Sequence, residues 1–273
     1  MGLPVHLKFT GLAILALGAA YGQTNARPVF ETFEVATIKP ASSEDARAGR
    51  YIRMQSAHRF QAKNYTVNGL IAAAYDLNPR MISSGPAWAE SDRYEVIAAT
   101  PGDQRPTYDD QMVMLRKLLA DRFNFTFHRE PKEFPVYELT VAKGGPKLTP
   151  SAAPPDEPYN VTTTLFPAAS GGIDHARLPA RNVTMGQFAS VMQRAILDRP
   201  VVDHTGLTSR YDFDLEWTPD ESQFGGQLPY GAPDSGKPGF FPSMQQQLGL
   251  KIEATRAMIE TLVIDHLDRP SAN

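Results

Sequence analysis

The sequence of 273 residues contains no cysteine. Without thiols the chain can form no disulfide, no redox-active cysteine pair and no cysteine-ligated zinc site. It also has little excess charge, because 27 Lys and Arg stand against 30 Asp and Glu. A chain without a broad basic field is a poor match for nucleic acid, so we expect no nucleic-acid partner. Stability must come from packing, for which an apolar content of 42% is sufficient.

Motifs for several kinds of catalysis are missing as well. The chain has no G-x-S-x-G and no S-x-x-K motif with its supporting partners. The stretch "AKGGPKLTPS" at 142–151 lacks the spacing of a phosphate loop, and Pro146 removes a backbone donor that such a loop needs. A Ser-His-Asp set from distant segments stays open, since triads are defined by geometry. We therefore predict no catalytic, cofactor-binding or metal-binding residues, and we leave enzymatic activity uncertain while favouring its absence.

Long apolar runs are absent except at the N-terminus. "MGLPVHLKFTGLAILALGAAYGQ" has a weakly basic start, an apolar stretch from Phe9 to Ala20, and small residues at Ala20 and Gly22 before Gln23. A retained membrane anchor is the competing interpretation, but the run is shorter than the ~20 residues that span a bilayer. We interpret residues 1–22 as a cleaved signal peptide and expect a soluble mature chain that is exported, periplasmic or extracellular.

Two segments are rich in Pro, Gly, Ser and Asp and have no helical or alternating period, namely 149–172 and 218–243. We interpret 149–172 as a linker between a first α+β half at 28–148 and a second at 173–270. The segment 218–243 is interpreted as a long loop within the second half. Loops of this length are sometimes binding lids.

The rest of the chain alternates strands and helices, which predicts an α+β fold. In the first half the strand "FEVATIKPA" is followed by an extended run that enters a helix at the cap Thr66, and then by the strand "RYEVIA". A second helix, with its cap at Asp109 or Asp110, follows. Two strands come next, separated by a break at Glu130-Pro131.

The same order returns in the second half. Thr184 and Gln187 form a capping-box pattern before a helix with the apolar stripe Met185, Phe188, Met192 and Ile196. "SDRYEVIAATP" at 91–101 is echoed by "TSRYDFDLEWTP" at 208–219, and the chain ends in a short helix, a strand from Leu250, a turn near 255–257 and a last strand at 261–266. Phe60, Ala62, Asn64 and Thr66 correspond to Leu178, Ala180, Asn182 and Thr184 at a constant offset of 118. We predict two related halves, which share one sheet or form two lobes.

Three Asp-His pairs are the most obvious candidates for metal ligands: Asp174-His175, Asp203-His204 and Asp265-His266. Neighbours along a strand point to opposite sides, so no pair has ligand spacing, and a metal would require distant segments to meet. We interpret these histidines as surface or loop residues. The glycosylation acceptor sequence Asn-x-Thr occurs three times, at Asn64, Asn160 and Asn182. At Asn64 and Asn182 it is explained by the predicted helix caps.

Three acidic side chains, Asp212, Asp214 and Glu216, share one face of a predicted strand. Such a row is compatible with calcium or with paired acids, but it is also the normal pattern of a solvated outer face, which we favour. The first half has Glu95, Ile97 and Ala99 on that face instead.

A rim of Trp88, Arg93 and Arg210 would suit ligand binding, because Trp and Arg are frequent in binding hot spots. We favour the alternative that these side chains cap and pack strand ends, since a Trp ring buries a large area.

Several stretches together resemble a known family: "FEVATIKP", "GPAWAESDRYEVIA", "LLADRFNFTFHRE", "VYELTVAKGGPKL" and the ending "QQLGLKIEATRAMIETLVIDHLDRPSAN". They are similar to the soil-associated, acidobacterial paralogous family of secreted proteins of unknown function, over the whole mature chain. Related domains follow membrane metallopeptidases of the β-lactam-sensor type, so the resemblance implies extracytoplasmic sensing or binding by analogy. Each capped helix with its strands also resembles the short N-terminal domain of secretins and TonB-dependent receptors.

Two functions remain. The first is a non-catalytic binding or interaction module that engages an envelope protein, peptide or glycan through loops or a strand edge. The second is an exported hydrolase that uses Asp, Glu and His from separate segments for acid-base chemistry. The missing nucleophile motifs favour the first.

Overall fold

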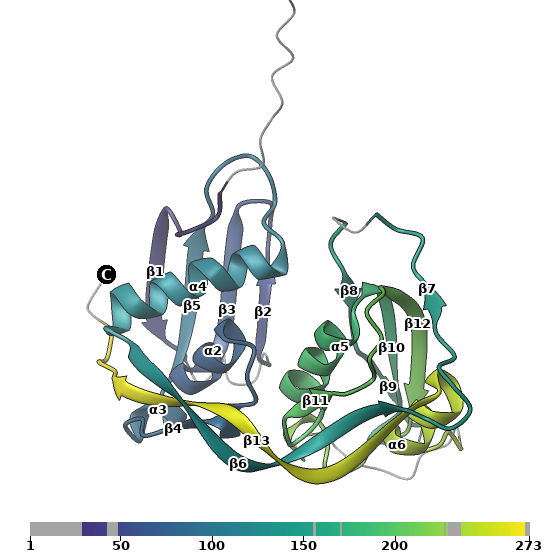
Figure 1. Cartoon of the computed structure of the whole chain (residues 1–273). Helices are drawn as coiled ribbons and strands as arrows, with labels where there is room; N and C mark the ends of the chain where they lie inside the picture. The colour runs from purple at the N-terminus through teal and green to yellow at the C-terminus, as the bar shows by residue number, and fades with distance from the viewer. Residues whose placement is uncertain are drawn as a thin grey trace, which may run out of the picture.

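The structure is a computed structural model that describes residues 29–42, 49–154, 157–169, 171–226, 228 and 236–270. The predicted signal peptide at 1–22 lies outside these residues. Two lobes stand side by side on a long two-stranded ribbon (Figure 1). Each lobe has helices packed on a mainly antiparallel sheet, so the fold is α+β, as the sequence predicts. In the described part of the chain, no helix combines the length and the apolar character needed to cross a membrane.

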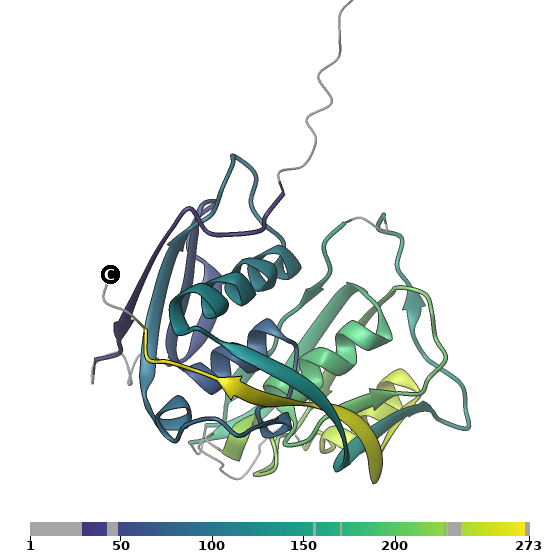
Figure 2. The same cartoon turned by 60° about the vertical axis from the view of Figure 1, so that its left-hand side comes forward.

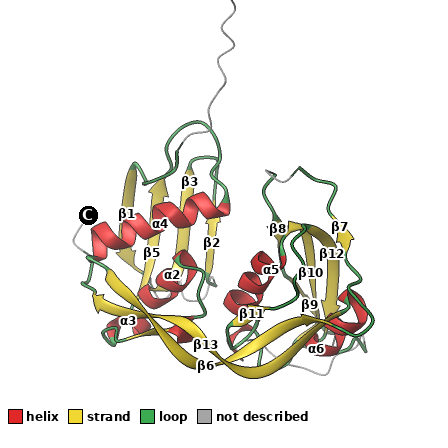
Figure 3. Ribbon diagram, in the orientation of Figure 1, coloured by secondary structure: helices red, strands yellow, loops and turns green. Residues whose placement is uncertain are grey.

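The first lobe, residues 29–125, has a sheet with the strand order β1-β5-β3-β2. Helices α2 and α4 lie against one face of it (Figure 3). Its strands and helices are β1 (Val35–Pro40), β2 (Tyr51–Met54), β3 (Arg59–Thr66), α2 (Val67–Ala74), η1 (Pro79–Met81), β4 (Ile82–Ser83), α3 (Trp88–Ser91), β5 (Arg93–Ala99) and α4 (Tyr108–Phe123).

Helix caps set where these helices begin. The side chain of Thr66 accepts a hydrogen bond from the backbone of Gly69, which confirms the predicted cap of α2. The predicted cap of α4 at Asp109 or Asp110 is wrong, because the cap is Thr107. Asp110 instead occupies the third helical position and completes a capping box with Thr107, so the acidic pair lies in the first turn, where carboxylates favour the helix dipole.

The second lobe, residues 142–249, has a sheet with the order β7-β12-β10-β8, and β9 also pairs with β10. Helix α5 begins at the predicted capping box of Thr184 and Gln187. The segment 149–172, predicted as a linker, supplies the three short strands β7, β8 and β9. The elements are β7 (Thr149–Pro150), β8 (Asn160–Val161), β9 (Thr164–Pro167), β10 (Ile173–Val183), α5 (Met185–Val191), η2 (Met192–Ile196), β11 (Val201–Asp203), β12 (Tyr211–Trp217), η3 (Phe224–Gly226), α6 (Phe240–Ser243) and η4 (Met244–Leu248).

The ribbon consists of β6 (Thr126–Val141) and β13 (Leu250–His266), which pair antiparallel over nearly their whole length. The predicted break at Glu130-Pro131 and the predicted turn at 255–257 are both wrong. Tyr137 donates its N–H to Pro200, away from β13, and the two-residue period places the nitrogens of Pro131 and Pro135 on that same side. The prolines therefore remove no hydrogen bond from the ribbon.

Each lobe has its own hydrophobic core, and the ribbon contributes to both. Leu262 and Ile264, near the end of β13, are buried in the core of the first lobe. Tyr137 and Leu139, near the end of β6, are buried in the core of the second lobe. Burying one such side chain contributes about 1.5–3 kcal/mol, so each long strand fastens its own lobe to the other. Figure 2 shows the ribbon passing from one lobe to the other.

The two ends of the ribbon are built alike. At one end β13 runs between β6 and β4, with Leu262 opposite Ile82. At the other end β6 runs between β13 and β11, with Tyr137 opposite Val201. Both short strands, β4 and β11, are parallel to the long strand that they contact. The third sheet therefore has the order β11-β6-β13-β4, in which the two long strands lie in the middle and one short strand lies at each edge.

A local irregularity also occurs in both lobes. Asn64 and Asn182 have the left-handed φ values of 59° and 54°, and each lies at a register shift between its strand and the neighbouring one. Arg93 donates to the carbonyl of Asn64 at 3.0 Å, and Arg210 donates to that of Asn182 at 2.8 Å. Both arginines thus satisfy a backbone carbonyl at a β-bulge.

Candidate functional site

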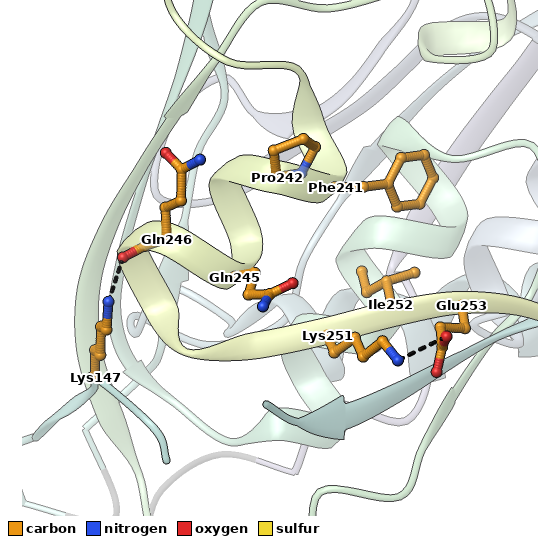
Figure 4. A pocket seen from close by; sticks show the side chains of 8 residues that line it. All are labelled: Lys147, Phe241, Pro242, Gln245, Gln246, Lys251, Ile252 and Glu253. Atoms are coloured by element: carbon orange, nitrogen blue, oxygen red, sulfur yellow. Dashed lines mark hydrogen bonds and ion pairs between the residues drawn. The ribbon is translucent and has the colours of Figure 1, made fainter. Parts of the chain in front are cut away.

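One hollow in the described surface lies beside the second lobe, between α6, η4 and the start of β13 (Figure 4). Its volume is about 620 Å³. Its two lysines are already engaged, because Lys147 donates to the backbone of Gln246 at 2.8 Å and Lys251 pairs with Glu253 at 2.7 Å. This hollow therefore offers a ligand few charged groups that are not already paired.

A second hollow, of about 260 Å³, lies between the two lobes. The first lobe supplies the end of α2 and the start of α4, and the second lobe supplies α5, η2 and the segment before β8. We name it the interlobe cavity. Its lining residues are Ala73, Ala74, Asp76, Tyr108, Asp109, Met112, Arg116, Tyr159, Gly186, Gln187, Ser190 and Arg194.

Arg194 is the central side chain of the interlobe cavity. Its Nη1 lies 3.3 Å from Oδ1 of Asp76 and donates to the hydroxyl of Tyr108 at 2.5 Å. The guanidinium also lies over the Tyr108 ring, 4.7 Å from its centroid. Since its side chain is only 20% exposed, these contacts compensate a largely desolvated charge.

The surroundings of Arg194 keep its aromatic neighbours neutral. Burial raises the pKa of Tyr108 to about 12, against an opposing effect of the Arg194 charge. Burial also raises the pKa of Tyr159, although Arg194 lowers it through its charge and a hydrogen bond. For Arg194 itself, burial lowers the pKa, but interaction with Tyr108 and Asp76 outweighs burial and the pKa is raised. At neutral pH the cation of Arg194 therefore lies beside two protonated phenols.

A larger hollow of about 610 Å³ also lies between the lobes, and Arg194 lines it too. Here Asn78 donates to the backbone of Gln193 at 2.9 Å, and Gln193 donates to the backbone of Asp76 at 2.9 Å. Arg80 pairs with Asp198 at 3.4 Å. The described contacts between the lobes at this point are thus hydrogen bonds and ion pairs, which suits a surface that is partly open to solvent.

The three Asp-His pairs lie in separate places. His175 contacts its own neighbour Asp174 at 2.6 Å, whereas His204 contacts Glu138 at 2.6 Å and His266 contacts Asp268 at 3.0 Å. Among the described residues, no three His, Asp or Glu side chains gather closely enough to hold a metal ion. None of these pairs lines the interlobe cavity.

The acidic row lies on the outer face of β12, opposite the buried face of Tyr211, Phe213, Leu215 and Trp217. Each member has a partner on the same surface: Asn182 donates its N–H to Asp212 at 2.8 Å, Arg181 lies 3.2 Å from Asp214, and Lys237 lies 2.6 Å from Glu216. Trp88 is also outside the interlobe cavity, with Arg269 over its ring at 5.3 Å. Together with Arg93 and Arg210, it forms no shared rim.

Sequence reasoning missed Asp76, Tyr108 and Arg194. A signal was present, because Asp76 and Arg194 are 118 positions apart, as are Arg80 and Asp198. The same offset of 118 separates Phe60 from Leu178 and Thr66 from Thr184 in the sequence, and the residues paired between the lobes carry opposite charges. Opposite charges at equivalent positions of two similar segments would have indicated that those positions face each other.

Comparison with known families gives one match. The family model described as "Protein of unknown function (DUF3738)" matches residues 68–267, which include most of both lobes and the ribbon. No curated protein and no solved structure is significantly similar to the chain.

Proposed function

The chain belongs to this family of proteins of unknown function, and we propose that it is an exported, non-catalytic binding protein whose ligand occupies the interlobe cavity. One observation carries the proposal: both lobes contribute polar side chains to a single cavity around the largely buried cation of Arg194. Ligand sites commonly lie where two structural units meet, with a few convergent polar groups. The proposed signal peptide at 1–22 supports export.

A second candidate is an exported hydrolase, because two carboxylates, Asp76 and Asp109, line the interlobe cavity. Asp76, however, is already engaged in an ion pair with Arg194 at 3.3 Å, which leaves Asp109 as the one unpaired carboxylate of the two. No cysteine is available as a nucleophile. Binding without chemistry therefore suits the cavity better than acid-base catalysis.

We also infer that the two lobes arose by internal duplication. Three features support this inference. The sheets of the two lobes have equivalent strand orders, and both lobes have a bulge at which an Arg donates to the carbonyl of an Asn. Each long strand of the ribbon also pairs with one short strand. Duplication would explain why the cavity lies between the lobes, because equivalent surfaces that pair about an axis enclose a shared space.

The test blocks the interlobe cavity and leaves the fold intact. Ser190, which lines the cavity, is replaced in S190W, and the exposed Ser91 on α3 receives the same substitution in S91W as the control. The mature chain from Gln23 and both variants are screened against small peptides, amino acids, sugars and nucleotides by thermal shift and heteronuclear NMR. We expect at least one ligand class that binds the unmodified chain and S91W, and binds S190W at least 10-fold more weakly. A folded S190W that binds every ligand as tightly as S91W does would contradict the proposal.

A further inference from the structure

We propose that the ligand of the interlobe cavity is a small zwitterion that carries both a carboxylate and an ammonium group, of the size of a free amino acid or a dipeptide. This inference rests on the proposed function, since it names the ligand class of the same cavity. Its basis is the arrangement of donors, acceptors and charges around Arg194.

The hydroxyl groups of two tyrosines provide the donors. Arg194 donates to the oxygen of Tyr108 at 2.5 Å and also forms a hydrogen bond with Tyr159. A phenol oxygen that accepts from a guanidinium keeps its own hydrogen for another partner. Among the described residues, no acceptor for the Tyr108 hydrogen is found. The two hydroxyls and the guanidinium are therefore suited to the oxygens of a carboxylate.

Gln187 adds a donor whose orientation is fixed. Its side-chain oxygen accepts from the backbone of Thr184 at 3.1 Å and from Arg210 at 3.3 Å. With the oxygen engaged in the helix cap, the NH₂ group is the part that remains available to a ligand in the cavity. A second carboxylate oxygen would therefore find a neutral donor from α5.

Asp109 provides the complementary acceptor. It lies in the first turn of α4, is exposed at the cavity and makes no hydrogen bond or ion pair with another described side chain. Asp76, by contrast, is paired with Arg194. The unpaired carboxylate of Asp109 is therefore suited to the ammonium group of a zwitterion whose carboxylate is bound by the donors beside Arg194.

The charge balance and the size of the cavity both favour such a ligand. Two cations, Arg116 and Arg194, and two anions, Asp76 and Asp109, line it, so their formal charges cancel. A ligand with a net charge would leave one of these groups uncompensated in a partly desolvated site. At ~30 Å³ per water, 260 Å³ corresponds to roughly nine water-sized volumes, which matches about the number of non-hydrogen atoms in an amino acid or a small dipeptide.

Isothermal titration of the mature chain tests the inference with free amino acids and dipeptides, each beside its N-acetylated and its C-amidated derivative. We expect each derivative to bind at least 10-fold more weakly than its parent, because each lacks one of the two charges. Y108F should weaken the parent about 10- to 100-fold through loss of a hydrogen bond to a charged group. D109N should weaken the parent similarly but leave the affinity of the N-acetylated derivative unchanged.

Two matched variants control for the loss of a hydroxyl or a carboxylate elsewhere, namely Y51F on the outer face of the first sheet and D103N in an exposed loop. Both should bind as the unmodified chain does. Derivatives that bind as tightly as their parents would overturn the zwitterion. If neutral sugars or nucleotides bind in a way that S190W abolishes while no zwitterion binds, this inference fails and the binding function stands. If nothing binds in a way that depends on Ser190, both fail.

Discussion

Two ion pairs between the lobes should differ in energy although their geometry is nearly the same. Asp76 and Arg194 lie 3.3 Å apart, and Arg80 and Asp198 lie 3.4 Å apart. The cation of the first pair is 20% exposed, whereas that of the second is 64% exposed; the anions differ less and in the opposite direction, with Asp76 44% and Asp198 25% exposed. We predict that the coupling energy of the first pair is several times that of the second, because burial and not distance sets the effective dielectric around each pair.

The magnitude follows from Coulomb's law. At about 3.3 Å two unit charges attract by about 5 kcal/mol at an effective dielectric constant of ~20 and by about 1 kcal/mol in water. Asp76 is 44% exposed, so its pair lies between these limits, and desolvation of Arg194 offsets part of the attraction. We expect a coupling energy of about 2 kcal/mol for Asp76 with Arg194, and below about 1 kcal/mol for the more exposed pair.

Double-mutant cycles measure both couplings. One cycle combines D76N with R194M, and the other combines R80M with D198N, each followed by urea unfolding. The cycle removes the contribution of the Tyr108 hydrogen bond, which R194M loses in either background. Because residues of both β6 and β13 pack in each of the two cores, we expect one unfolding transition. Added salt should reduce the second coupling more than the first. Equal couplings, or a larger one for Arg80 with Asp198, would refute the reasoning.

Three further predictions concern single positions. Gly249 and Gly206 have φ values of 64° and 66°, but a Cβ at Gly249 would lie 2.1 Å from a backbone oxygen, whereas a Cβ at Gly206 meets nothing within 4 Å. Urea unfolding should therefore show that G206A lowers the free energy of unfolding by about 1 kcal/mol and that G249A lowers it by at least about 3 kcal/mol. Equal losses of stability in the two variants would contradict the predicted clash at Gly249. The pKa of Tyr108 rises from 10.0 to about 12, so its contribution to stability is complete below pH 10 and is lost as the pH rises through 12; Y108F should remove about 2–3 kcal/mol of this alkaline loss, followed by tyrosinate absorbance and unfolding. The hydrogen bond from Lys237 lowers the pKa of Glu216, which stabilises the fold above pH 4.5 and stops doing so as the pH falls through the lowered pKa; K237M should raise that pKa in an NMR titration, and an unchanged titration would contradict the assignment.

Local chemistry determined the features that the sequence could predict. The caps at Thr66 and Thr184 depend on residues no more than three positions away, and the alternation in β12 depends on neighbours two positions apart. The cap of α4 was misplaced because Asp109 and Asp110 are good capping residues themselves, and only the hydrogen bonds show that Thr107 fills the role. Side-chain propensity ranks candidates for a cap, but backbone geometry selects one of them.

The long ribbon was beyond local prediction for a different reason. Proline is normally excluded from paired strands, so Pro131 predicted a break. The partner that overrides this prediction is Glu260, whose pairing is set by the meeting of two distant segments. Proline is tolerated when its nitrogen lies on the side of the strand that does not pair with the neighbouring strand. The sequence does not reveal which side of a strand is paired. The same holds for the interlobe cavity, whose residues come from four separate segments.

The opposite charges between the lobes also bear on which lobe can pair with which. If the lobes are duplicates related by a pseudo-twofold axis, the ancestral single lobe would have paired with an identical copy, and the residue at each axial position would have met itself. An acid would then face an acid. In this chain the two positions differ, so Asp76 faces Arg194 and Arg80 faces Asp198. The opposite charges stabilise pairing between unlike lobes and destabilise pairing between like lobes, because like charges placed together repel each other. On the inference of duplication, fusion would permit a specificity that an identical pair could not have, and Arg194, 20% exposed, is the charge that this pairing holds in the interlobe cavity.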